Sequence, residues 1–205
     1  MKFPSLCALS FAFASSAVAS TTSGIAPIEI SSLASSYAPE VYTDAGTIEA
    51  LRNTLAIYAF AIDGKDFDAL GKVFTTDAIA NYSAPLNVLT PLKTIQSVLD
   101  TSLGCVTTQH FYGTQRIDVL SPITATSVTY YRAAHFGKGD KGNEVAYAYG
   151  QYQDNWQRQS TGTWRIIHRN LVYMVSAFFS ELSAEKVTQY FPRAPLIGNM
   201  SVFVC

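Results

Sequence analysis

The sequence contains few charged residues. Asp, Glu, Lys and Arg make up only 14% of its 205 residues, and the net charge at pH 7 is −1. Because no basic stripe or acidic block is present, the pattern excludes a nucleic-acid footprint and indicates no strongly charged partner. The chain is instead 48% hydrophobic, with 12 Tyr and 12 Phe. This composition is typical of a folded domain with a large apolar interior.

Long apolar runs are also missing. The uncharged stretch from Leu6 to Ala17 is too short and too rich in Ser to span a membrane, so we expect no membrane insertion. It follows Lys2, and a cleavage motif of small residues ends at Ala19. We therefore predict that residues 1–19 are a signal peptide and that the protein is secreted or held in the secretory pathway.

Cysteine is scarce, with three copies. Cys7 falls in the predicted signal peptide, and an oxidising compartment favours a disulfide between Cys105 and Cys205. The alternative is one buried thiol and one cysteine that bonds a second chain. No Cys-x-x-Cys or His-x-x-x-His spacing occurs, so we expect no metal site. Two N-glycosylation sequons begin at Asn81 and Asn199.

Histidine is equally scarce, with three copies. His110 and His135 lie in runs of β-branched and aromatic residues, which predict strands. The ordinary pKa of His, about 6.5, makes it the side chain most often used for proton transfer near neutral pH. Both residues are therefore candidates for proton transfer, or alternatively ordinary hydrogen-bonded strand residues. We expect His168, on the last predicted strand, to be structural or solvent-facing.

Helical patterns occupy the first half of the chain. Residues 20–46, rich in Ser, Thr, Ala and Pro, are predicted to be a leader or a loosely docked arm. Apolar residues at helical spacing predict a first helix, with Thr47 as its N-cap. Two shorter helices follow, the second capped by Asp66 and the third with Pro91 in its first turn. The predicted helices span 48–62, 67–74 and 91–99.

Strand patterns occupy the second half. The turns between them are short and rich in Gly, Ser and Pro, so we expect an antiparallel meander. Helices followed by a curved sheet predict an α+β fold with a cone shape. The predicted strands span 79–82, 106–119, 126–136, 145–156 and 164–176. The domain is placed at 47–180, and a tail with a short helix (184–190) at 181–205.

Four strings occur in a characteristic order: IYAFAIDGKDFDAL from Ile57, VFTTDA from Val73, TQHFYG from Thr108 and GTWRI from Gly162. In this order they resemble the nuclear transport factor 2-like α+β cone fold. Within that fold, the likeness is strongest to scytalone dehydratase and the SnoaL-like polyketide cyclases, over roughly residues 48–178. The fold hosts dehydratases, cyclases, isomerases and non-catalytic members, so the resemblance implies an architecture more specifically than an activity.

The resemblance implies three catalytic residues: Asp63, His110 and His135. In that family an Asp orients one histidine while the other moves a proton beside a carbonyl group, and a tyrosine polarises the carbonyl. We assign the proton transfer to His110, and an orienting or second acid–base pair to Asp63 and His135. No metal or organic cofactor is implied. Candidate substrate-binding residues are the tyrosines Tyr58, Tyr82, Tyr131 and Tyr152.

The chain also departs from the scytalone dehydratase pattern. Ile62 stands where that enzyme has a second pocket tyrosine, and Tyr58, one turn earlier, is the candidate substitute. On the third long strand, Gly150 and Tyr152 replace a Ser and an Asn. These departures argue against scytalone as the substrate.

Several candidates have a structural alternative. Asp63 could bond the turn at Gly64, and each tyrosine could be an ordinary core residue. Asp154 shares a strand face with Tyr152, so we expect it either to face the site or to pair with Arg169 on the next strand.

Two functions from different classes follow. The first is a secreted, cofactor-independent dehydratase, isomerase or cyclase that acts on a small apolar oxygenated metabolite. The second is a non-catalytic secreted protein that binds a small molecule or serves a structural role in the same fold. The expected partner is a small-molecule ligand, and the outer faces of such sheets also pair into homodimers in this fold.

Overall fold

The computed structural model describes residues 25–37, 44–139 and 145–174. The predicted signal peptide, the sequon at Asn199, Cys205 and the helix over 184–190 lie outside these residues, so all four stay predictions. Among the described helices, none has both the length and the apolar character needed to cross a membrane.

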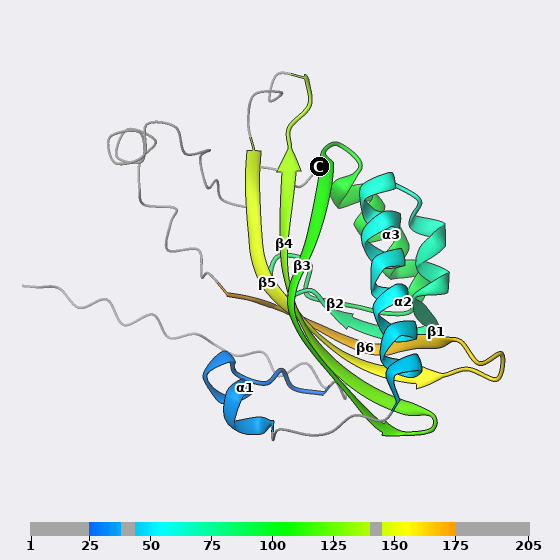
Figure 1. Cartoon of the computed structure of the whole chain (residues 1–205). Helices are drawn as coiled ribbons and strands as arrows, with labels where there is room; N and C mark the ends of the chain where they lie inside the picture. Colours follow the sequence, from blue (N-terminus) through cyan, green and yellow to red (C-terminus); the bar gives the residue numbers. More distant parts are fainter. Residues whose placement is uncertain (1–24, 38–43, 140–144, 175–205) are drawn as a thin grey trace, which may run out of the picture.

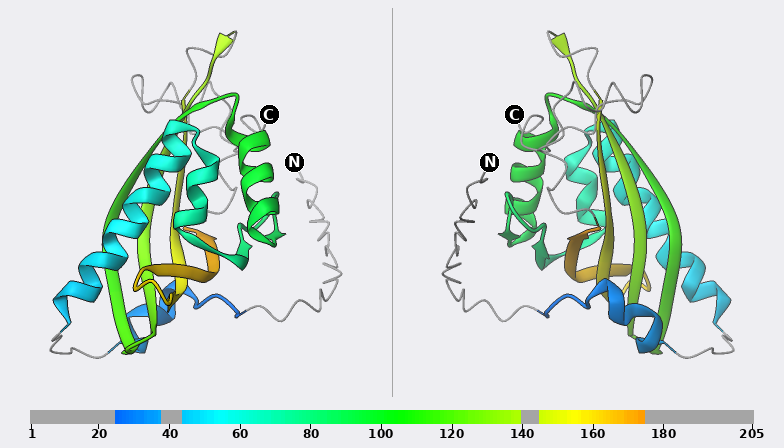
Figure 2. Two further views of the ribbon diagram at one scale, coloured as in Figure 1. Left: turned by 90° about the vertical axis from the view of Figure 1, so that its right-hand side faces the viewer. Right: turned by 90° about the vertical axis from the view of Figure 1, so that its left-hand side faces the viewer.

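The architecture is a curved six-stranded sheet with helices on both sides (Figure 1). The strand order is β2-β1-β6-β5-β4-β3. The long helices α2 and α3 cover the concave face of the sheet, and the short helix α1 lies on the side of its convex face. Figure 2 shows the same arrangement from two further sides. All neighbouring strands are antiparallel except β1 and β6. The predicted α+β fold is therefore confirmed.

Helix α2 (Ala45–Gly64) packs an apolar stripe against the sheet. Leu51, Leu55 and Ile62 are fully buried. The prediction of Thr47 as N-cap was wrong: the carboxylate of Asp44 accepts from the Thr47 backbone N–H at 2.9 Å, and the helix begins three residues earlier than predicted. An Asp at the cap position satisfies an N–H that has no partner within the helix.

The chain between α2 and α3 departs further from the prediction. Asp66 caps a 3₁₀ helix, η1 (Phe67–Lys72), as expected, but Phe74 already begins strand β1 (Phe74–Asn81). The short strand β2 (Val88–Leu89) was not predicted. Helix α3 (Leu92–Leu103) starts one residue after Pro91. Pairing of β1 with β6 overrides the helical spacing of the apolar residues before it.

The remaining strands form the predicted antiparallel meander. They are β3 (Thr107–Ser121), β4 (Thr124–Phe136), β5 (Val145–Arg158) and β6 (Trp164–Tyr173). Cross-strand partners share a face of the sheet, so the register fixes which side chains meet. His110 lies opposite Ala133, and His135 lies opposite Thr108. Both histidines therefore face the helices, two residues apart along the sheet.

Part of the N-terminal arm is docked on the convex face. The Gln153 side chain donates to the Ile28 carbonyl and accepts from its N–H, both at 2.7 Å. Asn170 donates to the Ile25 carbonyl at 2.8 Å. Helix α1 (Ile30–Ser36) follows, with Leu33 buried. The described part of the arm is thus held by specific hydrogen bonds rather than loosely docked.

Candidate functional site

The site is built on a contact between the end of α2 and strand β3. Asp63, one residue before the end of the helix, accepts from the His110 backbone N–H at 2.8 Å. Its second oxygen lies 2.7 Å from Nδ1 of the His110 ring. Because a carboxylate only accepts, Nδ1 carries a proton, and in the neutral ring the lone pair is therefore on Nε2. This arrangement fixes both the orientation and the tautomer of the ring.

The two side chains differ in exposure. The His110 side chain is 6% exposed and that of Asp63 is 24% exposed. Burial raises the pKa of Asp63, but the hydrogen bonds and charge of His110 outweigh it, so the pKa lies below its ordinary value. Asp63 is therefore ionised at neutral pH and can stabilise positive charge that forms on the ring during proton transfer.

His135 does not join this pair. Asp63 was predicted to pair with His135, and the structure places it against His110 instead. The reason is the register: α2 packs on β3, whereas His135 lies on β4 opposite Thr108. Nδ1 of His135 is buried and has no hydrogen-bond partner in the described part of the chain. Burial, together with His110 and Lys65, lowers its pKa to about 4, so it is neutral at pH 7.

Stability should fall in mild acid because of His135. Its pKa is about 4 in the folded chain and 6.5 ordinarily, so the unfolded chain binds more protons between these values. The stability that depends on a neutral His135 is fully present above pH 6.5 and is lost as the pH falls toward 4. The total loss is about 3 kcal/mol. Urea unfolding at pH 7 and pH 5 should show about 2 kcal/mol of this loss, because pH 5 is about 1.5 units below the ordinary pKa. His135→Gln should lose less stability over this interval than the wild type, and an equal loss would contradict the assignment.

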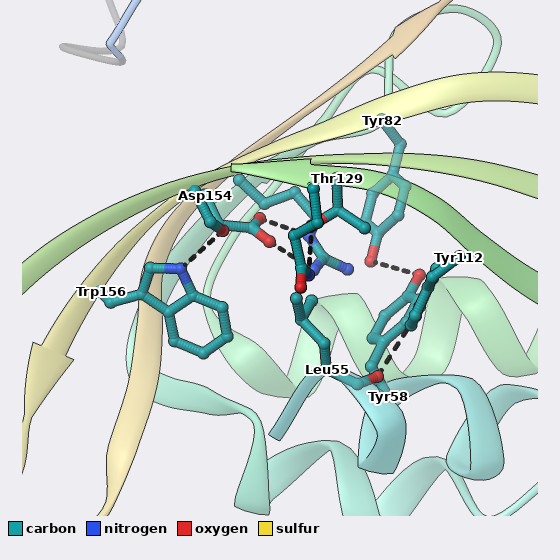
Figure 3. Close-up of polar contacts among 10 residues, drawn as sticks. Leu55, Tyr58, Tyr82, Tyr112, Thr129, Asp154 and Trp156 are labelled. Carbon is teal, nitrogen blue, oxygen red and sulfur yellow. Dashed lines mark hydrogen bonds and ion pairs between the residues drawn. The ribbon is translucent and has the colours of Figure 1, made fainter. Parts of the chain in front are cut away.

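Tyrosines surround the His110 ring. Tyr131 stacks beside it, with ring centroids 6.3 Å apart, and Tyr58 meets it edge-on at 6.1 Å. Tyr152 stacks on Tyr131 at 4.4 Å. The Tyr82 hydroxyl lies 3.2 Å from that of Tyr58 (Figure 3). Two of the four predicted tyrosines therefore contact the His110 ring, and the other two, Tyr82 and Tyr152, pack against those two.

Three of these tyrosine hydroxyls, those of Tyr82, Tyr131 and Tyr152, stay protonated at neutral pH. Burial raises the pKa of Tyr82, Tyr131 and Tyr152 well above the ordinary value. The hydroxyls of Tyr131 and Tyr152 make no hydrogen bond to any other described residue. Both are therefore buried hydroxyl donors without a partner among the described residues.

Gly150 explains how Tyr131 fits. The two residues are cross-strand partners, and a Cβ at position 150 would lie 2.7 Å from the Tyr131 ring and 2.7 Å from the Val172 carbonyl. Only glycine leaves this space open. The departures at positions 150 and 152 therefore act together, since one provides room for Tyr131 and the other provides the ring on which it stacks.

A buried ion pair between Asp154 and Arg169 lies behind the tyrosines. The sequence left this pairing as one of two alternatives for Asp154. Arg169 on β6 donates to Asp154 on β5 through Nε at 2.7 Å and Nη2 at 2.8 Å. Both side chains are fully buried. The guanidinium lies 4.0 Å from the Tyr152 ring centre and 4.3 Å from that of Tyr58. Its Nη1 is buried without a hydrogen-bond partner in the described ranges.

Arg169 and Tyr112 were missed as site residues. The alternation of β3 places Tyr112 on the same face as His110, and its hydroxyl donates to the Leu55 carbonyl at 3.2 Å (Figure 3). That period of two was the available signal for Tyr112. For Arg169 there was only its opposition to Asp154 on the neighbouring strand.

Other predicted residues lie away from the His110 ring. Asn81 ends β1, and its side chain accepts from the Ser83 N–H at 3.0 Å. Glycosylation there stays a prediction. Cys105 lies in the turn before β3, and its pairing with Cys205 also stays a prediction. His168 is buried on the opposite sheet face from Arg169, so it is not solvent-facing. Within the described residues, no three His, Cys, Asp or Glu side chains could jointly hold a metal ion.

The arrangement suits general acid–base chemistry. An oriented imidazole offers Nε2 as a base, and the protonated hydroxyls of the surrounding tyrosines are groups that can donate to an oxygen that gains negative charge. A buried guanidinium behind the tyrosines adds positive potential.

Comparisons with known proteins give one matching family model and several solved structures of the same fold. A family model described as a SnoaL-like domain matches residues 43–170. No curated protein matches the chain. Among solved structures, a proposed scytalone dehydratase from Novosphingobium aromaticivorans superposes with a TM-score of 0.57 at 23% identity, over 65% of this chain and 89% of that one.

Two further structures have the same fold. A hexachlorocyclohexane dehydrochlorinase superposes with a TM-score of 0.56 at 13% identity, over 63% of this chain and 86% of that one. A nuclear transport factor 2-like protein from Salmonella enterica superposes with a TM-score of 0.55 at 15% identity, over 64% and 95%. At these identities the likenesses show the fold alone.

Proposed function

Because the chain belongs to the SnoaL-like domain family, we propose that it is a cofactor-independent acid–base enzyme that acts on a small, largely apolar, oxygenated molecule. The observation that carries the proposal is the Asp63–His110 contact, in which both carboxylate oxygens hold one histidine. A carboxylate that fixes the imidazole tautomer leaves Nε2 as the base. The reaction class is dehydration, isomerisation or cyclisation.

The proposed steps follow from the positions of the groups. Nε2 of His110 removes a proton from the carbon next to a carbonyl group, and the electron pair moves to the carbonyl oxygen as an enolate. A tyrosine hydroxyl, from Tyr131 or Tyr152, donates to that oxygen. In a dehydration, a hydroxyl on the next carbon then leaves, takes the proton held by His110, and departs as water. In an isomerisation the same proton returns to a different carbon.

The proposal includes secretion. Its support is the uncharged run at 6–17 with the small residues that end at Ala19. N-terminal sequencing of protein recovered from the culture medium of an expressing host tests it, with a start near Ser20 expected.

The activity can be tested without knowing the substrate. A panel of aromatic and aliphatic hydroxyketones is incubated with the protein in D₂O, and deuterium at the carbon next to the carbonyl is measured by mass spectrometry. We expect exchange for compounds that bind, at least about tenfold faster than with His110→Gln. His168→Gln, on the other face of the sheet, is the matched control and should exchange as the wild type does.

The second candidate function is binding without catalysis. It is favoured by the close stacking of Tyr131 on Tyr152, which is the packing of ordinary core aromatics. The same experiment separates the two functions. Compounds that quench tyrosine fluorescence on binding, yet exchange equally fast with the wild type and His110→Gln, would identify a binding protein and refute the enzyme.

A further inference from the structure

We infer that Lys65 binds a carboxylate group of the ligand, so that the ligand class is an aromatic or apolar carboxylic acid. The inference rests on the proposed function in one respect, which is that the ligand lies at the same site. The ammonium would hold the carboxylate at the outer end of the site, beside Asp63 and His110, while the apolar body contacts the tyrosines.

The backbone places Lys65 at the site. It is the first residue after α2 and adopts a left-handed conformation, with φ of 61°. From there its half-buried side chain reaches strand β3, where Nζ donates to Oγ1 of Thr108 at 3.1 Å. Thr108 lies two residues before His110 on the same face and opposite His135. The ammonium is thus beside the two histidines rather than out in solvent.

The ammonium of Lys65 forms no direct ion pair with any described residue. An ammonium has three N–H donors, and the Thr108 hydroxyl takes one of them. The carboxylate of Asp63 forms no direct ion pair with Lys65; its two oxygens accept from the ring and the backbone of His110, although its negative charge still acts on the ammonium. Two donors of a half-buried cation are left for an external acceptor.

The surrounding charge also favours an anion. Burial lowers the pKa of Lys65, and so does the positive charge of Lys138, while Asp63 opposes them. His135 is held neutral next to this cluster. Placing a cation in such surroundings is unfavourable unless it is paired. A carboxylate would supply the missing acceptors, and its single negative charge matches that of the Lys65 ammonium.

The alternative is that Lys65 only braces β3 through Thr108. A bracing role would affect stability and not the choice between ligands. The decisive readout is therefore a binding preference between two molecules of the same shape, one anionic and one neutral.

The experiment measures the binding of 2-naphthoate and of its neutral amide, 2-naphthamide, by calorimetry. The wild type should bind the acid about tenfold more tightly than the amide, and Lys65→Met should remove this preference while keeping the affinity for the amide. Lys93→Met, on the exposed side of α3, is the matched control and should keep the preference. Circular dichroism confirms that each variant is folded.

The inference is overturned if the wild type binds the acid no more tightly than the amide, or if Lys65→Met retains the preference. Neither result affects the proposed function, which is measured separately by His110-dependent deuterium exchange. Conversely, loss of exchange with a retained preference for the acid would leave Lys65 as the anion site of a binding protein.

Discussion

Asp63→Asn is expected to lower turnover by about a thousandfold while leaving ligand affinity nearly unchanged. The carboxylate accepts from both Nδ1 and the backbone N–H of His110. An amide can keep one of these bonds but presents an N–H to the other position, so it favours the tautomer with the proton on Nε2. In that tautomer the ring lone pair is on Nδ1, so Nε2 cannot accept a proton from the substrate.

The measurement is steady-state kinetics on the compound that exchanges fastest, with kcat and KM reported separately. The expected pattern is a fall in kcat with an unchanged KM, because Asp63 acts through His110. Asp68→Asn, an exposed acid on η1, removes the same charge nearby and should behave as the wild type. Nitrogen chemical shifts of His110 provide a readout independent of stability, since they report which ring nitrogen carries the proton. A variant with full kcat would remove Asp63 from the mechanism.

The sequence predicted which residues lie at this site, but it did not predict which histidine Asp63 contacts. The spacing of Asp63 at a helix end and of both histidines on neighbouring strands indicated one site. It did not indicate which histidine Asp63 would contact, because that depends on the register of β3 and β4, in which His135 faces Thr108. Register is set by contacts along two whole strands, and a local string does not contain it.

Errors at element boundaries have the same origin. Asp44 and Thr47 are both good caps, and the choice depends on where the chain enters the helix. The helical spacing of Phe67, Leu70 and Val73 continued into Phe74, yet β1 begins there because β6 offers a parallel partner. In each case a tertiary contact selected between two locally reasonable structures.

Removing the Asp154 carboxylate is expected to destabilise the protein by about 3–5 kcal/mol, the largest effect on stability that we predict for one substitution. In Asp154→Ala, Arg169 stays fully buried without either of its two charge-assisted bonds. Its Nη1 already lacks a partner among the described residues, so the guanidinium would retain none of the hydrogen bonds that it makes there. Urea unfolding at pH 7 measures the change.

A double variant separates the charge from the packing. Asp154→Leu with Arg169→Met replaces both buried ions with apolar side chains of similar volume, and we expect stability near that of the wild type. If Arg169 serves only the fold, this variant should also keep the wild-type rate of deuterium exchange. If the guanidinium stabilises negative charge through Tyr58 and Tyr152, the variant should fold normally and exchange at least about tenfold more slowly. If the double variant keeps its stability but loses activity, the buried positive charge of Arg169 serves the chemistry at His110 rather than the fold.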